Sequence, residues 1–172
     1  MEKNIKFVID VLQSLTAKHP TLHLVIVGDG QARNDLENYV TEKQLTEKVI
    51  FTGYVERENL KDFYSTANVF VFASKVESQG LVTLESMACG TPVVAIGKMG
   101  TREVMGGDSG GFMVDDDMDL FVEKVDLLLS NREICQQKSE EAEHHAERWT
   151  IQAQAVKMEK LYHSLHHKYS NK

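Results

Sequence analysis

Residues 77–95 read ESQGLVTLESMACGTPVVA, and this short stretch contains a loop, a helix, a turn and a strand in succession. A helix is predicted from Gln79 to Cys89, because the turn at Gly90-Thr91-Pro92 ends it. The apolar run 92–96 then predicts a buried strand, and a similar run at 68–73 precedes the loop. Two strands joined by a helix of this length indicate a βαβ unit, in which the strands lie parallel in one sheet.

The same alternation of strands and helices continues on both sides of this unit. Towards the N-terminus, the predicted strands are 22–27 and 49–52, and the predicted helices are 4–18, 36–45 and 57–65. Beyond Gly110-Gly111 the sequence is mainly helical, over 117–130, 132–148 and 151–168. We therefore predict an α/β fold: a Rossmann-like doubly wound parallel sheet with helices on both faces, followed by a helical C-terminal extension.

The composition is that of one ordinary domain covering residues 1–172, with 42% hydrophobic and 26% charged residues. A formal net charge of −7 argues against nucleic-acid binding, which depends on clustered lysine and arginine. No stretch approaches the roughly 18 consecutive apolar residues of a membrane span, and the N-terminus lacks the layout of a signal peptide, so a cytoplasmic location is expected. The two cysteines, Cys89 and Cys135, indicate neither a disulfide framework nor a zinc site.

Three loops follow predicted strands and therefore lie at the carboxyl edge of the sheet, where open parallel sheets bind ligands. They are 28–30, 53–55 and 74–81. The first resembles a dinucleotide-binding loop, but Arg33 stands where that fingerprint has its third glycine, and no acidic residue ends the strand at Thr52. A nicotinamide site is therefore not predicted. A tight turn alone explains Gly28 and Gly30, which remain candidates for contact with a ligand.

The third loop carries two carboxylates. Glu77 precedes the predicted helix and Glu85 lies about two turns inside it, so the spacing can bring both to one side of a single cleft. Gly80 permits a close approach to the backbone, and the free N–H groups of the first helical turn attract phosphate oxygens. Sugar nucleotides present both hydroxyls and phosphates to such a site. The alternative interpretation is a solvated helix face with two unrelated glutamates.

The stretch 77–95 resembles the E-x7-E signature of the retaining glycosyltransferases of family 4, in which a glutamate, a Gly-Leu or Gly-Phe pair and then Glu-Ala-Met-Ala-x-Gly-x-Pro-Val-Val-Ala recur. Other segments resemble the family in the same order along the chain, and the likeness covers about residues 2–114. These segments are Glu2-Lys3-Asn4, 24–30, 49–55 and 67–71.

This resemblance implies the GT-B architecture, in which two Rossmann-like domains face each other across a cleft. The chain corresponds to the C-terminal, donor-binding domain. The N-terminal acceptor domain and the family's diphosphate-binding arginine are not found in the sequence, so we expect the fragment alone to be inactive. A Rossmann-like domain normally begins with a strand, whereas this sequence opens on a helix, which suggests a further strand upstream.

The resemblance also implies residue roles. Glu85 would hold the ribose hydroxyls of the nucleotide, and Glu77, as the catalytic residue, would contact hydroxyls of the donor sugar near its anomeric carbon. Lys3 would pair with the diphosphate, and Val55 would contact the base mainly through its backbone. The other donor-binding positions are Gly28, Gly30, Gly80, Leu81 and Val82, the last three through N–H groups directed at phosphate. No metal ion or other cofactor is expected to be required.

The implied reaction moves a hexose from a UDP-sugar, or from a GDP-sugar, to a hydroxyl of a glycolipid, a lipopolysaccharide or another glycan, with retention. Whether retention arises by front-face attack or through a covalent intermediate stays open. Two alternatives are a GT-B sugar-nucleotide 2-epimerase domain and a non-catalytic Rossmann-type binding module.

For the full-length enzyme, peripheral contact with the inner face of the membrane is expected. Leu161, Tyr162 and Leu165 predict an exposed apolar patch that would promote a homodimer of the fragment.

Overall fold

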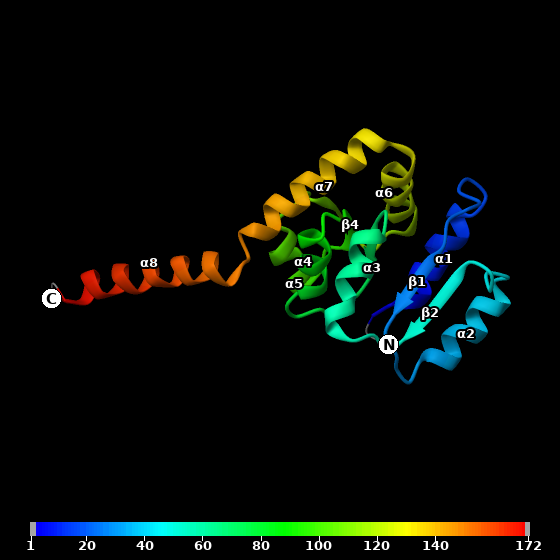
Figure 1. Ribbon diagram of the computed structural model, residues 1–172, viewed down its shortest axis with the longest axis horizontal. Coiled ribbons are helices and arrows are strands. Elements are labelled where there is room, and N and C mark those ends of the chain that lie inside the picture. Colours follow the sequence, from blue (N-terminus) through cyan, green and yellow to red (C-terminus); the bar gives the residue numbers. More distant parts are fainter. Residues whose placement is uncertain (1–2, 171–172) are drawn as a thin grey trace.

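The computed structural model describes residues 3–170, in which strands and helices alternate before three helices complete the chain (Figure 1). The strands are β1 (Leu24–Val27), β2 (Val49–Gly53), β3 (Phe70–Phe72), β4 (Val93–Ile96) and β5 (Gly111–Val114). The helices are α1 (Ile5–Leu15), α2 (Arg33–Glu42), the 3-10 helix η1 (Arg57–Asn59), α3 (Leu60–Thr66), α4 (Leu81–Ala88), α5 (Met99–Met105), α6 (Met118–Ser130), α7 (Arg132–Glu147) and α8 (Ile151–Ser170).

The five strands form two neighbouring parallel sheets. β1 pairs with β2, with Leu24 opposite Val49, while β4 lies between β3 and β5, with Val93 opposite both Phe70 and Gly111. Within residues 3–170, no strand pairing joins β1 to β3. The predicted α/β class, the parallel strands and the helices on both faces are confirmed, but the strands are not hydrogen-bonded into one continuous sheet.

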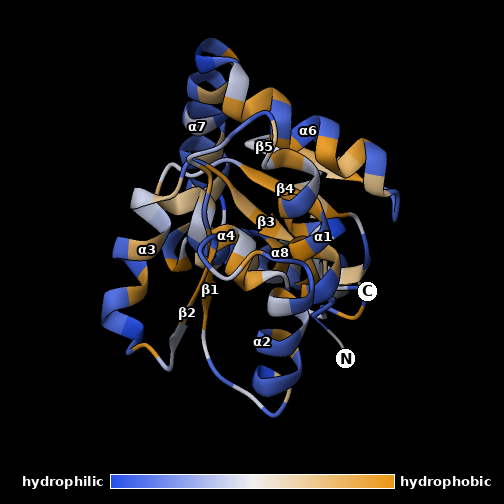
Figure 2. Ribbon diagram, turned by 90° about the vertical axis from the view of Figure 1, so that its right-hand side faces the viewer, coloured by the Kyte–Doolittle hydropathy of each residue, from blue (hydrophilic) through white to orange (hydrophobic). Residues whose placement is uncertain are grey.

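The core lies on both faces of β4, whose four residues are all fully buried. Val94 and Ile96 face α1 and α6 and pack in one cluster with Val8 and Phe121. Val93 and Ala95 face the opposite way and pack with Met87 of α4, Met105 of α5 and Ala142 of α7. Figure 2 shows the resulting apolar interior, with orange strands between helices whose outer faces are blue. A continuous apolar run is therefore the pattern of a strand covered on both sides.

Two elements, α5 and β5, were not predicted from the sequence. The segment 97–111 contains six glycines among its 15 residues, which weakens any helical or strand periodicity. β5 has only four residues and begins at Gly111, where a Cβ would lie 1.9 Å from the Val93 carbonyl oxygen of β4. The close approach of two backbones therefore explains a glycine inside a strand.

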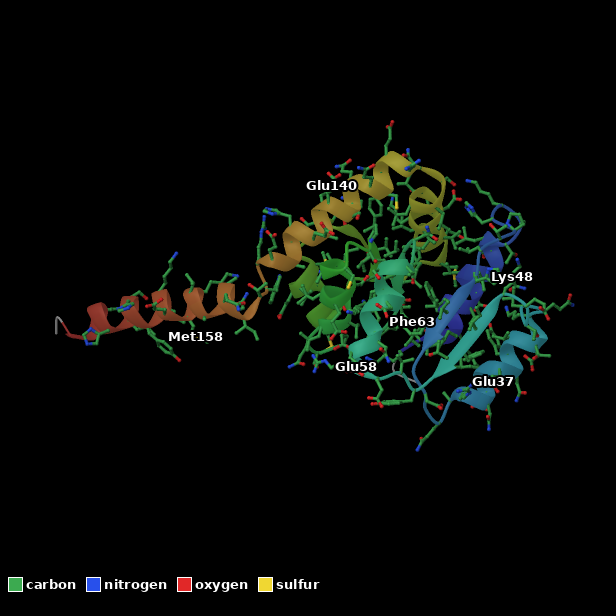
Figure 3. The ribbon with its side chains drawn as sticks, viewed as in Figure 1. Glu37, Lys48, Glu58, Phe63, Glu140 and Met158 are labelled. Carbon is green, nitrogen blue, oxygen red and sulfur yellow. The ribbon has the colours of Figure 1, made fainter. Side chains whose placement is uncertain are left out.

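The last helix, α8, extends away from the rest of the molecule, and Met158 lies on this projecting part (Figures 1 and 3). Its apolar side chains are largely exposed: Leu161 to 51%, Tyr162 to 64% and Leu165 to 41%. The predicted apolar patch is thus present, while the homodimer stays a prediction. In the part of the chain that the structure describes, no helix combines the length and the apolar content needed to cross a membrane.

Candidate functional site

Glu77 lies in the loop between β3 and α4, at the carboxyl edge of the sheet, and its carboxylate is held on both oxygens. Lys3 Nζ donates to Oε2 at 2.8 Å, and the N–H groups of Gln79 and Gly80 each donate to Oε1 at 3.3 Å. These donors, Lys3 foremost, hold the pKa of Glu77 below its usual value, although partial burial acts in the opposite direction. The carboxylate is therefore ionised at neutral pH, and only 15% of the side chain is exposed.

Gly80 sits at the N-terminus of α4 in the left-handed conformation, with φ of 69°. The amides of Leu81 and Val82 are the first two of the helix and have no carbonyl one turn earlier to bind. The Gly80 amide, in contrast, already donates to Glu77. Leu81 is 52% exposed, so the helix start is accessible from solvent.

The Glu77 loop packs directly on α5 through two glycines. The Gly100 N–H donates to the Glu77 carbonyl at 2.9 Å. A Cβ on Gly100 would lie 2.4 Å from the Ser78 carbonyl oxygen, and a Cβ on Gly80 would lie 2.9 Å from the Gly100 carbonyl oxygen. Neither position can carry a side chain without moving backbone. No pattern in the sequence indicates this contact.

Glu85 lies inside α4 and is fixed by a residue that the sequence did not single out. The Tyr64 hydroxyl of α3 donates to Glu85 Oε2 at 3.1 Å. Burial, and then the charge of Glu85, raise the pKa of that hydroxyl well above its usual value, so it remains a donor. The Tyr64 ring packs edge-on against Phe70 at 5.5 Å, and Thr91 Oγ1 donates to the Tyr64 carbonyl. Tyr64 thus sets the orientation of the Glu85 carboxylate.

Gly28 ends β1 in a backbone conformation that favours glycine, and a turn follows from Gly30 to Arg33, whose N–H donates to the Gly30 carbonyl at 3.1 Å. Gly28 has φ of 118°, and its N–H donates to the Gly53 carbonyl at 3.0 Å, which joins the ends of β1 and β2. The Gly30 N–H donates to Asp29 Oδ1 at 2.7 Å. Val55 follows β2 and is partly exposed. Both glycines thus have a structural role, and a contact of these residues or of Val55 with a ligand stays a prediction.

The candidate site therefore lies along the carboxyl edge of the sheet. It combines the ionised Glu77, the Glu85 carboxylate oriented by Tyr64, the start of α4 and the ammonium of Lys3. Oxygen acceptors of this kind suit hydroxyl groups, and the amides and the ammonium suit phosphate. Within residues 3–170, no group of three or more histidine, cysteine, aspartate or glutamate side chains is arranged to hold a metal ion.

Comparison with known proteins identifies relatives of this chain. A family model described as "Glycosyl transferases group 1" matches residues 1–145. The chain is 38% identical over 96 residues to an alpha-monoglucosyldiacylglycerol synthase of Streptococcus pneumoniae, covering 56% of this chain and 22% of that protein. It is 30% identical over 154 residues to a sulfoquinovosyl transferase of Arabidopsis thaliana, covering 87% and 29%. The chain thus spans less than a third of the length of these two relatives.

Solved structures show the same fold. TarM of S. aureus, in a complex that contains UDP, superposes with a TM-score of 0.83 at 20% identity, over 94% of this chain and 33% of that one. The C-terminal domain of a Francisella tularensis protein, described as a glycosyl transferase group 1 family protein, superposes with a TM-score of 0.78 at 22% identity. That match covers 87% of this chain and 81% of the domain, so most of this chain shares the fold of that domain.

Proposed function

Because the chain belongs to the group 1 glycosyl transferases, we propose that its carboxyl edge binds a nucleoside diphosphate sugar, with UDP-sugars favoured over GDP-sugars, for transfer of a hexose to an acceptor hydroxyl. The observation that carries this proposal is the pair of oriented carboxylates, Glu77 and Glu85, at either side of the start of α4. Three solved neighbours, TarM, HepE of Anabaena and the pneumococcal GtfA, were crystallised with UDP, which supports a uridine nucleotide.

In this proposal each group has one task. Glu85 accepts hydrogen bonds from the ribose hydroxyls, while Tyr64 keeps its carboxylate oriented. The Leu81 and Val82 amides at the start of α4 bind the diphosphate, and Lys3 exchanges its ion pair with Glu77 for one with phosphate. Val55, Gly28 and Gly30 lie at the same edge and contact the nucleotide mainly through their backbone.

Glu77 is the proposed catalytic residue. During transfer the acceptor oxygen bonds to the anomeric carbon, the bond from that carbon to the diphosphate breaks, and the acceptor proton leaves with the phosphate group. Positive charge then develops on the sugar ring. The ionised Glu77 stabilises that charge and holds the sugar hydroxyls, while the helix start and Lys3 neutralise the departing diphosphate without a metal ion. The acceptor, a glycolipid, lipopolysaccharide or other glycan, would be bound by a further domain.

Titration calorimetry with the 172-residue chain tests this function. We expect UDP-glucose to bind more tightly than GDP-mannose, and both to bind more tightly than NAD. NAD carries a ribose at both ends of its diphosphate, whereas Glu85 and the start of α4 provide hydrogen-bonding groups for a ribose at one end only. Preferential binding of NAD would overturn the proposal and favour a dinucleotide-binding module. Release of free UDP and a 2-epimerised sugar from a UDP-sugar would instead favour the epimerase alternative.

Replacing Tyr64 by phenylalanine is expected to weaken UDP binding by about threefold to tenfold, because a single hydrogen bond to Glu85 contributes about 1 kcal/mol to the carboxylate's orientation. The ring and its packing on Phe70 are retained, so the thermal stability should change little. Calorimetry measures the affinity. Tyr162→Phe, on the exposed α8, is the matched control and should bind UDP as the original chain does. An unchanged affinity in Tyr64→Phe would remove Tyr64 from the site.

Replacing Lys3 by methionine is expected to raise the pKa of Glu77, because the largest cause of its lowered value is the hydrogen bond from Lys3. Carbon-13 NMR of the carboxyl group measures this pKa. A lowered pKa in the folded state stabilises the protein fully above the unfolded value, about 4.5, and this contribution is lost as the pH falls through the folded value. The variant should therefore lose about 1 kcal/mol or less at pH 7, and its deficit should shrink below pH 4.5.

The matched control for this pH effect is Lys6→Met. The Lys6 ammonium lies over the Tyr39 ring and away from Glu77, so its removal should leave the pKa of Glu77 unchanged. Equal pKa values of Glu77 in the Lys3 variant and in the original chain would show that the ion pair does not form in solution.

A further inference from the structure

Helix α7 contacts the ends of the two helices that begin at the candidate site. The C-terminal ends of α4 and α5 both lie against α7 (Figure 1). The Ser139 hydroxyl of α7 donates to the Gly90 carbonyl, in the turn after α4, at 2.6 Å. The Lys138 ammonium donates to the Asp108 carbonyl, in the turn after α5, also at 2.6 Å. One helix therefore supports the far ends of both α4 and α5.

A buried histidine of α7 makes a third contact of this kind. His145 is only 8% exposed, and its Nε2 lies 2.6 Å from the Val104 carbonyl oxygen. Because a carbonyl oxygen can only accept, Nε2 carries the proton and donates it. The Val104 carbonyl is one of the last four of α5, which have no amide partner inside a helix. His145 thus satisfies an acceptor at the C-terminal end of α5.

The other ring nitrogen of His145 has no corresponding contact. Nδ1 is buried and has no hydrogen-bond partner among the residues that the structure describes. Buried polar atoms in folded proteins are normally paired, because an unpaired one costs free energy. An apolar side chain of similar size would fill the same space without leaving a nitrogen unpaired. The contact of Nε2 with Val104 is therefore what a histidine contributes at this position.

Helix α5 links this contact to the Glu77 loop. Its seven residues span about 10 Å. Thr101, Val104 and Met105 are each 3% exposed or less, so the helix cannot tilt without disturbing the close-packed core. At its start, the Gly100 N–H donates to the Glu77 carbonyl at 2.9 Å, with the two backbones in direct contact. A displacement at the end of α5 is therefore transmitted to the loop at its start.

We propose that His145 is a positioning residue for the nucleotide-sugar site: it fixes the end of α5, and α5 holds the Glu77 loop in the arrangement that binds the donor. This inference rests on the proposed function, because it gives His145 a part in the ligand binding assigned above to the carboxyl edge. His145 is buried behind α5 and acts through this helix, not on the ligand. Its effect depends on the hydrogen bond from Nε2 and not on the volume of the ring.

Three substitutions of His145 separate the hydrogen bond from the packing. His145→Leu removes the donor and keeps an apolar side chain of moderate size. In His145→Gln, the amide nitrogen is as many bonds from Cα as Nε2 is, so it can donate to Val104. In His145→Asn, the amide nitrogen corresponds to Nδ1 and does not reach that carbonyl. His144→Leu, at the neighbouring position where 72% of the side chain is exposed, is the matched control.

Two measurements are made on each protein: hydrogen exchange of the Gly100 amide by NMR, which needs no ligand, and UDP binding by titration calorimetry. In His145→Leu and His145→Asn, exchange at Gly100 should be about threefold to tenfold faster, and UDP binding should weaken by a similar factor, because a hydrogen bond that supports the loop is lost. In His145→Gln and His144→Leu, both quantities should stay within about twofold of those of the original chain.

Unchanged exchange at Gly100 or unchanged UDP affinity in His145→Leu would overturn the proposal. So would a His145→Gln variant that behaves like His145→Leu, because ring volume and not the hydrogen bond would then matter.

A further control, Asn131→Ala, removes the N-terminal cap of α7 and so lowers stability at the end of the helix away from α5. An equal loss of UDP affinity in this variant would attribute the effect of His145 to general instability and refute a positioning role. If the original chain did not bind UDP, the proposed function would fail, whereas the exchange of Gly100 would still decide whether His145 holds the loop.

Discussion

Replacing Glu85 by glutamine is expected to weaken the binding of UDP by about tenfold to a hundredfold. A carboxylate that accepts hydrogen bonds from two ribose hydroxyls contributes about 1.5–3 kcal/mol, and each 1.4 kcal/mol corresponds to a factor of ten. The variant keeps the size of the side chain and an oxygen that can accept from Tyr64, which lies 3.1 Å from Oε2 in the structure. The fold should therefore be preserved, and titration calorimetry isolates the effect on the ligand.

Two controls make this result specific. Glu159→Gln, on the exposed α8, changes the net charge equally and should leave UDP binding unchanged. A UDP analogue without the 2′ and 3′ hydroxyls should bind the original chain and Glu85→Gln with similar affinity. Without these hydroxyls the analogue cannot form a ribose hydrogen bond with the side chain at position 85 in either protein. If Glu85→Gln bound UDP as tightly as the original chain, Glu85 would not be the ribose ligand.

Replacing Gly100 by alanine is expected to have the second large effect. Its Cβ would lie 2.4 Å from the Ser78 carbonyl oxygen and 2.6 Å from the Gln79 nitrogen, so the backbone of the Glu77 loop or of α5 must shift. Overpacking of this kind costs roughly 1–3 kcal/mol. The shift should also lengthen the hydrogen bond from Gly100 to the Glu77 carbonyl and lower UDP affinity by about tenfold. Chemical denaturation and calorimetry measure the two effects.

Gly107→Ala separates the loss of stability from the change at the site. Gly107 has φ of 117°, so alanine is strained there by about 1 kcal/mol, but no atom lies within 4 Å of the new Cβ. This variant should be destabilised and still bind UDP normally. If Gly100→Ala and Gly107→Ala both retained full UDP affinity, the contact between the Glu77 loop and α5 would have no part in ligand binding.

The sequence predicted secondary structure best where the spacing of the apolar residues matches the faces that are buried in the structure. The run Pro92–Ile96 predicted β4, and the spacing of Val8, Leu12 and Leu15 predicted α1, because a strand covered on both faces and an amphipathic helix each leave a distinct period. Some predicted helix ends extended past the observed ones by a few residues: the first helix, predicted to reach Lys18, ends at Leu15. The C-terminal helices α6 and α7 start at Asp117 and Asn131, whose side chains cap them.

The site was predicted in part. The loop position of Glu77 and the helical position of Glu85 followed from the sequence, because a predicted strand precedes them and a predicted turn ends the helix after them. Their partners did not. Tyr64 is 21 residues from Glu85, and an isolated tyrosine in an amphipathic helix carries no signal of such a contact. The packing of Gly100 on Ser78 was equally invisible, since it depends on how two separate loops approach each other.

The ion pair between Lys3 and Glu77 also has a consequence for the order of folding. The two residues are 74 positions apart, so the β3–α4 unit that contains Glu77 and Glu85 can form without this contact. The loop acquires it only after α1 has docked across the sheet, and long-range contacts of this kind form late, because a large loop must first be closed. We therefore expect the Glu77 loop to reach its final arrangement only once the N-terminal helix is in place, later than the β3–α4 unit around it.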